Sequence, residues 1–335
     1  MTGPVPPVFS RRPGPGAFGE VRRALRGWLD RHGNAFPDAG EVCVGLSGGA
    51  DSLALTAAAV AEFDTVRALV VDHRLQAGSD RVAARAARQA VDLGCGDAEV
   101  LAVDVHGAGG MEAAARRARY PALARARGGA PVLLAHTLDD QAETVLLGLA
   151  RGSGPRSIRG MSEFDAPWGR PLLGLRREVT RRACVELGLD PHEDPHNRDP
   201  AFTRVRLRTE VLPLLEEVLG GGVAPALART ATQLQEDGAV LDRAAAACLD
   251  RARAADGTLD VAVLGEVEAP VVRRVLREWL LGGGARELTD SHLRAVADLV
   301  VRWRGQGPVA LPGGGPGARL VASRRRGRLN LGTEG

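Results

Sequence analysis

The pattern of apolar and polar positions divides the first two thirds of the chain into short β-like runs that alternate with helical stretches. An amphipathic helix is expected near 18–31. Four apolar runs follow, each succeeded by a helical segment: Glu41 to Leu46, Val66 to Asp72, Ala98 to Val105 and Pro131 to His136. This alternation is typical of an α/β fold with a doubly wound parallel sheet and right-handed crossovers. Because ligands of such sheets bind beyond the carboxyl ends of the strands, the loops there are candidate functional segments.

The pattern changes at residue 203, after which helical periodicity dominates. Helices are expected at 203–219, 224–254, 270–281 and 289–303, with short β-like pieces near 308–311, 319–323 and 328–331. The run Gly220-Gly221-Gly222 marks a boundary between the two patterns. We therefore predict a disordered, proline-rich leader at 1–16, an α/β domain at 17–220 and a smaller, mainly helical C-terminal domain at 221–335.

The first strand runs into the loop Ser47-Gly48-Gly49-Ala50-Asp51-Ser52, which opens a helix. Glycines let the backbone approach an anion, and the helix N-terminus offers unpaired N–H groups, so the loop predicts a polyphosphate site. A Walker A loop is excluded because it needs a lysine and the chain has none. Asp51 beside phosphate requires a bridging cation, which implies Mg²⁺. The plainer alternative is a turn that only caps a helix.

Polar residues also follow the second and fourth strands. His73 and His136 stand at these strand ends, where they either contact a nucleotide or make structural hydrogen bonds. Asp139, Asp140 and Glu143 open the helix after the fourth strand. Asp140 and Glu143 are three residues apart and share one helix face, so both can point into one pocket. Asp139 fits a simple partner of the helix dipole, whereas the group of acids indicates a cationic guest.

Composition narrows the class further. The 335 residues are 44% hydrophobic, enough for a sizeable core, and the net charge is only +3. Seven arginines and no acids lie between 301 and 330, a pattern that fits either phosphate contacts or a solvated basic end. The four cysteines form no Cys-x-x-Cys pair, which argues against zinc or iron–sulfur sites. With no apolar run of membrane-spanning length, we expect a cytoplasmic protein without membrane association.

The motif Ser47-Gly-Gly-Ala-Asp51-Ser52 is similar to the signature of the PP-loop ATP pyrophosphatases, which cleave ATP between its α and β phosphates. Further segments, in order and spacing, resemble the bacterial tRNA(Ile)-lysidine synthetases over roughly residues 40–210: Val71 to Leu75, Glu112 to Tyr120, Ala135 to Thr144, Arg151 to Gly154, Arg170 to Leu173, Asp194 to Asn197 and Arg204 to Arg206. Two departures are His196, where the family usually has serine, and Val205, where asparagine is usual.

The resemblance implies ATP-dependent ligation of L-lysine to C2 of the wobble cytidine in a CAU-anticodon tRNA(Ile), through an adenylated tRNA, with AMP and pyrophosphate as products. It implies that ATP is bound by the loop residues with His73 and His136, and that Asp51 holds Mg²⁺ through ATP. Arg116 would stabilise the α-phosphate, and Asp140 and Glu143 would bind lysine. The remaining assignments are Arg204 and Arg206 for substrate, and Arg302, Arg304 and the arginines of 324–328 for tRNA.

Three alternatives stay open at this point. The chain can be another PP-loop enzyme that thiolates tRNA or amidates a nucleotide, although the separated cysteines argue against sulfur transfer. It can also be a tRNA-binding module with an inactive nucleotide fold, although such a site would have no reason to keep closely spaced acids. The oligomeric state, a homodimer included, is not determined by the sequence.

Overall fold

The computed structural model describes residues 9–10, 12–35, 40–106, 110–152, 154–314 and 318–334. Residues 1–8 and 11 of the predicted leader lie outside this part of the chain. The chain divides into two compact units, 1–147 with 160–230, and 148–159 with 231–335. Each unit is described by itself.

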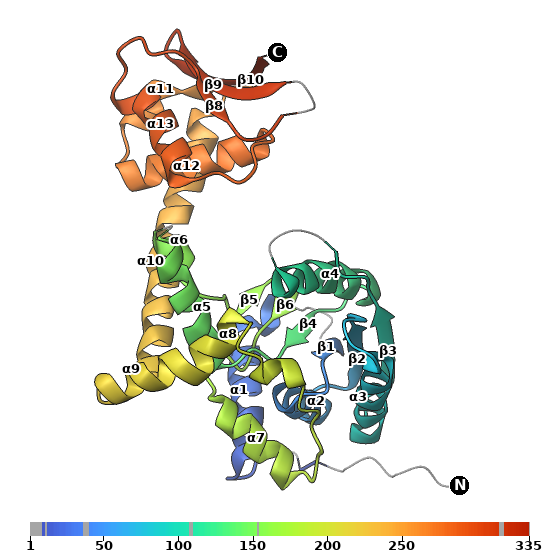
Figure 1. The fold of residues 1–335 in the computed structure, drawn as a ribbon. Coiled ribbons are helices and arrows are strands. Elements are labelled where there is room, and N and C mark those ends of the chain that lie inside the picture. Colours follow the sequence, from blue (N-terminus) through green and yellow to red (C-terminus); the bar gives the residue numbers. More distant parts are fainter. Residues whose placement is uncertain are drawn as a thin grey trace. The chain divides into compact units, whose positions relative to one another are not determined.

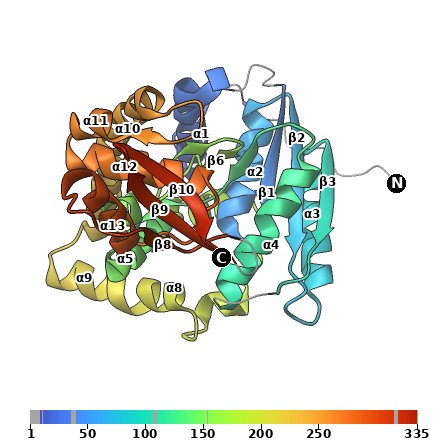
Figure 2. The ribbon, with the colours of Figure 1, turned by 90° about the horizontal axis from the view of Figure 1, so that it is seen from above.

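The first unit is built on a six-stranded sheet with strand order β3-β2-β1-β4-β6-β5. All neighbouring strands are parallel except the antiparallel edge pair β5 and β6. Figure 2 shows β1, β2 and β3 side by side. The strands are β1 (Glu41–Leu46), β2 (Thr65–Asp72), β3 (Asp97–Ala102), β4 (Val132–Leu134), β5 (Phe164–Asp165) and β6 (Trp168–Gly169). The predicted α/β fold with a parallel sheet is confirmed, and the four expected strands lie within three residues of their predicted ends.

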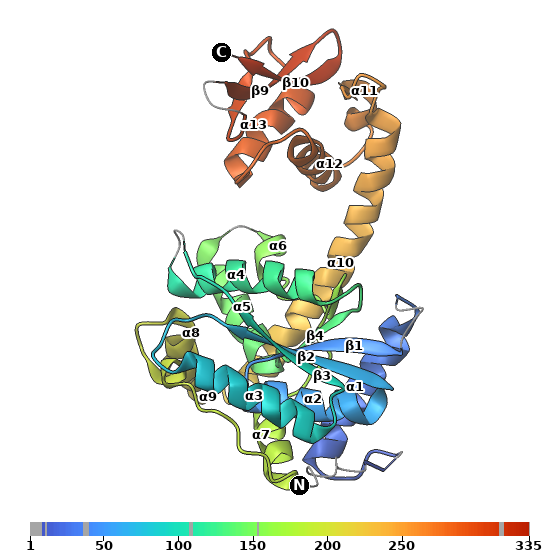
Figure 3. The ribbon, with the colours of Figure 1, turned by 90° about the vertical axis from the view of Figure 1, so that its right-hand side faces the viewer.

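Helices cover both faces of this sheet (Figure 3). The helices of this unit are α1 (Ala17–His32), α2 (Ala50–Glu62), α3 (Ser79–Leu93), α4 (Met111–Ala126), α5 (Leu138–Arg151), α7 (Arg177–Glu186), α8 (Thr203–Arg206) and α9 (Leu212–Val218), and those that pack on the sheet are α1, α2, α3 and α7 on one face and α4 on the other. On one face, Leu25 of α1 and Leu55 of α2 share a core with strand residues and α7. On the other, Leu123 of α4 packs on Leu69 and Leu134. Burial of both faces explains why the strands read as continuous apolar runs.

The second unit combines helices with a four-stranded antiparallel sheet of order β7-β10-β9-β8 (Figure 1). Its helices are α6 (Pro155–Ile158), α11 (Val261–Gly265), α12 (Ala269–Gly282) and α13 (Asp290–Val301), and its strands are β7 (Leu259–Asp260), β8 (Val309–Leu311), β9 (Arg319–Arg325) and β10 (Arg328–Glu334). Trp279, Leu299 and Leu329 join helices and sheet in one core. The expected smaller C-terminal domain is present. It contains a four-stranded sheet in addition to its helices, and therefore more β-structure than predicted.

The division between the units differs from the predicted boundary at Gly220–Gly222. The glycine run only precedes α10 (Val223–Ala252), and the units divide between Thr230 and Ala231, inside this helix. Val223 and Ala224 lie in a buried cluster with Leu138 of α5 and therefore belong to the first unit. The glycines mark a break in secondary structure, whereas the division depends on packing that no local pattern records.

Among the described residues, no single helix has the length and apolar character needed to cross a membrane. One bent pair, Thr203–Val218 with Val223–Ala252, passes the same test by length and composition, with 96° between its two parts.

Candidate functional site

The loop between β1 and α2 has the backbone geometry of an anion cradle. Gly48 has φ of +81°, and a Cβ placed there would lie 3.2 Å from the Cβ of Ala86. Gly49 is the N-cap of α2, and no side chain accepts a hydrogen bond from the first backbone N–H groups of this helix. Glycine at position 48 is therefore favoured by both conformation and space, whereas Gly49 has an ordinary extended φ of −76°, and the positive end of the helix is left available to an anion.

Internal hydrogen bonds hold this loop in place. Ser52 Oγ donates to the carbonyl oxygen of Gly49 at 2.9 Å and accepts from the amide of Ser47 at 3.2 Å. The amide of His192 donates to the carbonyl oxygen of Gly48 at 2.9 Å. The cradle is thus preorganised, and Ser52 stabilises its shape in addition to its predicted role as a ligand.

Two histidines with unsatisfied nitrogens stand at the ends of β2 and β4, as predicted. Nδ1 of His73 and Nδ1 of His136 are buried without a hydrogen-bond partner in the described part of the chain. Burial lowers the pKa of both, and for His136, where Arg119 also lowers it against the effect of Asp140, the pKa falls to about 3. Both rings are therefore neutral at pH 7, and each has a nitrogen free for a ligand.

Helix α4 brings arginines to these histidines. Arg119 lowers the pKa of both rings, and its own pKa is lowered, first by burial. Arg116, the predicted α-phosphate residue, is exposed, and its Nη2 donates to the Tyr120 hydroxyl at 3.1 Å. Both arginines add positive potential at His136, with Arg119 the larger influence. The position beside the strand ends is therefore cationic and suited to phosphate.

The acids of α5 have separate partners. Asp140 Oδ2 accepts from the amide and the hydroxyl of Thr137, both at 2.8 Å, and so caps the helix. Asp139 Oδ2 accepts from the amide of Arg177 at 2.7 Å, and Asp139 Oδ1 from Arg176 Nε at 3.1 Å. Asp139 therefore fastens the start of α7, a stronger structural role than the predicted dipole partner.

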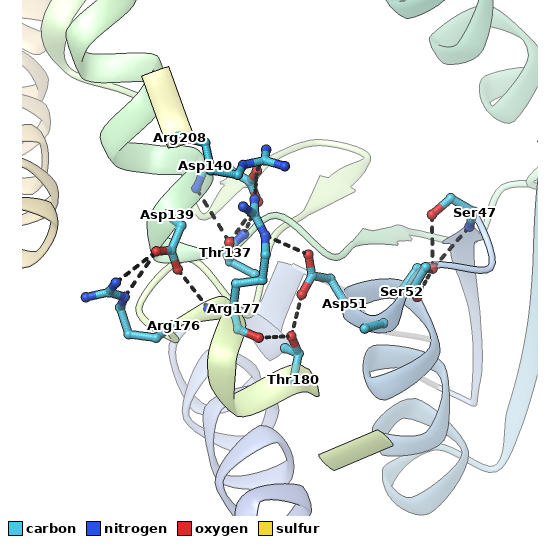
Figure 4. A network of polar contacts seen from close by, with 12 residues as sticks. Ser47, Asp51, Ser52, Thr137, Asp139, Asp140, Arg176, Arg177, Thr180 and Arg208 are labelled. Carbon is cyan, nitrogen blue, oxygen red and sulfur yellow. Dashed lines mark hydrogen bonds and ion pairs between the residues drawn. The ribbon is translucent and has the colours of Figure 1, made fainter. Parts of the chain in front are cut away.

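Arg177 links the phosphate loop to the acids of α5 (Figure 4). Its guanidinium lies 2.5 Å from Asp140 Oδ1, 3.3 Å from Asp51 Oδ2 and 3.6 Å from Glu143 Oε1. Thr180, one turn further along α7, donates its hydroxyl to Asp51 Oδ1. The carboxylates predicted to bind Mg²⁺ and lysine thus surround one protein cation, Arg177, which was not among the predicted site residues.

Glu143 is fully buried among arginines. Arg208 Nε donates to Glu143 Oε1 at 2.8 Å, and Arg204 Nη1 lies 3.7 Å from Glu143 Oε2. Arg206, also predicted to bind substrate, is instead 60% exposed and pairs with Glu210 at 2.9 Å. The structure brings Arg204 to the acids and places Arg208, which was not predicted, where Arg206 was expected. Arg204 and Arg208 are four positions apart and share one helix face, whereas Arg206 is two positions from each and faces another side.

Burial sets the protonation behaviour of the acids. It raises the pKa of Asp51 and of Glu143 above their ordinary values, more than neighbouring Arg177 and Arg208 respectively lower them. For Asp140 burial acts in the same direction, but Arg177 and the hydrogen bonds of Thr137 outweigh it and hold the pKa below its ordinary value. The site therefore contains one firmly ionised acid and two that accept a proton more readily.

The donor set does not form a metal site by itself. Among the described residues, no group of three or more His, Cys, Asp or Glu side chains is placed to hold a metal ion. Asp51 supplies one carboxylate at the phosphate cradle, and Mg²⁺ is commonly bound by one or two carboxylates together with substrate phosphates. The residues present thus fit a cation that arrives with a polyphosphate.

The cysteines are not placed for catalysis. Cys43, Cys95, Cys184 and Cys248 are all free and buried. Burial raises the pKa of Cys43 and of Cys184 to about 11 and that of Cys95 to about 12. Thiolates are the reactive form, so these side chains are inert at neutral pH.

Comparison with known proteins matches both units. A sequence model described as the PP-loop domain matches residues 25–215, and one described as the TilS substrate binding domain matches residues 259–329. A tRNA(Ile)-lysidine synthase of Rhodococcus opacus is 67% identical over 315 residues, 94% of this chain and 95% of that protein. One of Mycobacterium tuberculosis is 61% identical over 291 residues, 86% of this chain and 90% of that protein.

Solved structures share the fold at much lower identity. The U34-tRNA thiolase NcsA of Methanococcus maripaludis, described with its [4Fe-4S] cluster, aligns with a TM-score of 0.52 and 17% identity over 66% of this chain and 80% of that one. At this identity the match concerns the fold alone.

Proposed function

The chain belongs to the tRNA(Ile)-lysidine synthase family, and from this membership we propose that it ligates L-lysine to C2 of the wobble cytidine in tRNA(Ile) with a CAU anticodon. ATP is the second substrate, and AMP and pyrophosphate are the products. The reaction needs one pocket that holds a polyphosphate and, next to it, a cation-binding group of acids.

The observation that carries the proposal is the direct connection between these two parts. Asp51 of the phosphate loop and Asp140 and Glu143 of α5 contact the same guanidinium, that of Arg177. Carboxylates that already enclose a protein cation have the chemistry to bind the ammonium group of free lysine. The two halves of the reaction therefore have their groups within one continuous network.

In the first step the C2 carbonyl oxygen of the cytidine attacks the α-phosphate of ATP, and pyrophosphate leaves. The backbone of Gly48 to Ser52 holds the leaving phosphates at the N-terminus of α2. Arg116 and Arg119 add positive charge near His136, where the α-phosphate becomes more negative in the transition state. His73 and His136 use their free Nδ1 atoms to orient the nucleotide.

Mg²⁺ accompanies ATP in this proposal, with Asp51 as its protein ligand. When bound, the ion neutralises negative charge on the leaving pyrophosphate. Binding of the ion by Asp51 requires that the contact between Asp51 and Arg177 loosens.

In the second step the amine of lysine displaces AMP from C2. Asp140 and Glu143 bind the ammonium groups of lysine, and Glu143, with its raised pKa, can take the proton that the attacking amine releases. Free lysine also carries an α-carboxylate, for which Arg204 and Arg208 offer guanidinium donors next to Glu143.

The second unit binds tRNA in this proposal. Arg302 is 74% exposed and Trp303 is 39% exposed, so they offer a charge and an aromatic ring to RNA. We assign phosphate contacts to Arg302 and Arg304. Arg324 has a structural role, because its Nη1 donates to the carbonyl oxygen of Leu299 at 2.9 Å and its guanidinium lies over the Trp303 ring at 5.3 Å.

The alternatives are less well supported. Sulfur transfer lacks a reactive thiol, since all four cysteines are buried. An inactive tRNA-binding module would not require the buried acids at the phosphate loop. The free, buried cysteines also suit a reducing compartment, and we propose the cytoplasm as the location.

The test combines the enzyme with ATP, Mg²⁺, radiolabelled L-lysine and a CAU-anticodon tRNA(Ile) transcript, beside a transcript in which the wobble cytidine is replaced. We expect AMP release and lysine incorporation only with the cytidine. AMP release without lysine incorporation would leave a PP-loop enzyme with another substrate. No AMP release in either reaction would contradict the proposed activity.

A further inference from the structure

A cavity of about 320 Å³ lies within the second unit, outside the site described above. Its lining comes from α6, α10 and α12: Arg156, Asp242, Ala245, Arg274, Arg277, Glu278 and Leu281. Three guanidinium groups thus face two carboxylates, and the lining has a net positive charge.

Asp242 is shared by several of these cations. Its Oδ1 accepts from Arg156 Nη2 at 2.7 Å and from Arg274 Nε at 2.9 Å, and its Oδ2 lies 3.8 Å from Arg159 Nη1. The single negative charge of Asp242 therefore neutralises only part of the positive charge of these three arginines. The surplus positive charge stays at the wall of the cavity.

Arg277 increases this surplus. Its pKa is lowered, first by burial and then by the charge of Arg156. In the described part of the chain, no carboxylate lies within 4 Å of its guanidinium nitrogens. A half-buried arginine that faces a like charge is stabilised when an anion enters between them.

We propose that this cavity binds a phosphodiester of the tRNA backbone, with Arg277 and Arg156 as its ligands. Planar guanidinium groups match phosphate oxygens in pairs, and Ala245 and Leu281 offer an apolar wall to the attached ribose. The volume exceeds that of a single phosphate ion and suits a phosphate with part of its nucleotide. This assignment rests on the proposed function only in naming tRNA as the source of the phosphate.

The experiment measures tRNA(Ile) binding by full-length wild type, Arg277→Ala and Arg277→Lys over a range of salt concentrations. Loss of one charge-assisted phosphate contact weakens binding about tenfold and lowers the slope of log K against log salt by about 0.7–0.9. Arg277→Lys keeps the charge and the slope but recovers only part of the affinity. Arg294→Ala is the matched control, because Arg294 is 72% exposed and pairs with Asp290 on α13.

Three further readouts separate a binding role from a structural one. The KM for tRNA rises in Arg277→Ala while kcat at saturating tRNA is unchanged. Glu278→Gln removes negative charge from the lining and strengthens binding. Inorganic phosphate is added as a competitor of tRNA binding. If the phosphodiester is the ligand, inorganic phosphate displaces tRNA from wild type only weakly. Strong displacement by inorganic phosphate would overturn the inference and assign the cavity to a free anion.

Equal affinity and equal salt slope for Arg277→Ala and Arg294→Ala would overturn the inference. This failure is distinct from failure of the proposed function. A wild-type enzyme that forms lysidine normally while Arg277→Ala binds tRNA normally refutes only the cavity assignment. A wild-type enzyme that forms no lysidine refutes the proposed activity, and tRNA binding still tests the cavity.

Discussion

Replacing Arg177 with methionine removes a cation that contacts Asp51, Asp140 and Glu143 while it keeps most of the side-chain volume. Removal of one member of a buried ion pair typically costs about 3–5 kcal/mol. Asp140 and Asp51 retain 18% and 25% exposure, and Glu143 keeps Arg208, so the lower end applies, about 3 kcal/mol of unfolding free energy. For a unit of this size, that lowers Tm by about 6–12 °C.

The pH dependence of this loss follows from the pKa directions. In wild type, the lowered pKa of Asp140 contributes stability that is present above the unfolded pKa and is lost as pH falls. Without Arg177, the pKa values of all three acids rise, so the folded state binds more protons than the unfolded state. The variant therefore gains stability as pH falls from 8 towards about 5, and its deficit against wild type shrinks.

Urea unfolding of wild type, Arg177→Met and Arg176→Met at pH 8 and pH 5 measures both effects. Arg176 is the control, because it is 49% exposed and pairs with Asp139, a contact with an expected value of about 0–1 kcal/mol. Added Mg²⁺ raises the stability of Arg177→Met more than that of wild type, since it replaces the missing charge. The reasoning is refuted if Arg177→Met is no less stable than Arg176→Met at pH 8, or if its deficit grows at pH 5.

Four other substitutions test the site. Gly48→Ala forces alanine to a φ of +81°, a strain of about 1–2 kcal/mol, and raises the KM for ATP about tenfold in steady-state assays. Glu143→Gln leaves formation of the adenylated tRNA, measured as pyrophosphate release in a single turnover, near wild type but slows transfer of labelled lysine about 100-fold, and equal loss of both steps would contradict its role. Arg206→Ala changes the KM for lysine by less than about twofold, whereas Arg204→Ala raises it clearly; the reverse order would contradict their assignment.

Four of the six strands of the first unit were predictable because their signals are local, whereas the two-residue strands β5 and β6 were not predicted. A run such as Val132–Leu134 is apolar throughout, as a strand buried on both faces must be, and β1 was predicted with its observed ends. The end of the first unit was not predictable in this way. Val223 and Ala224 belong to it only because they pack on Leu138, which is 85 residues away from Val223 in sequence.

The candidate site shows the same contrast. Asp51, Asp140 and Glu143 stood out because each follows a strand or opens a helix, and the structure brings all three to one cation. Arg177 and Arg208 gave no such signal in a chain whose 44 Lys+Arg residues are all arginine. The sequence contained only an indirect sign of such a cation. Three carboxylates expected in one site need positive charge beside them, but this requirement does not say which arginine supplies it.

By itself, the sequence determined the α/β class, the phosphate loop, the acids of α5 and the family resemblance, since these depend on short segments with their own periodicity and spacing. Tertiary structure alone decided which arginine neutralises the acids, which side of α8 and the following turn faces Glu143, and where the two units divide. Charges and packing partners that are distant in sequence interact only after the chain has folded, so their energies leave no trace in a local pattern.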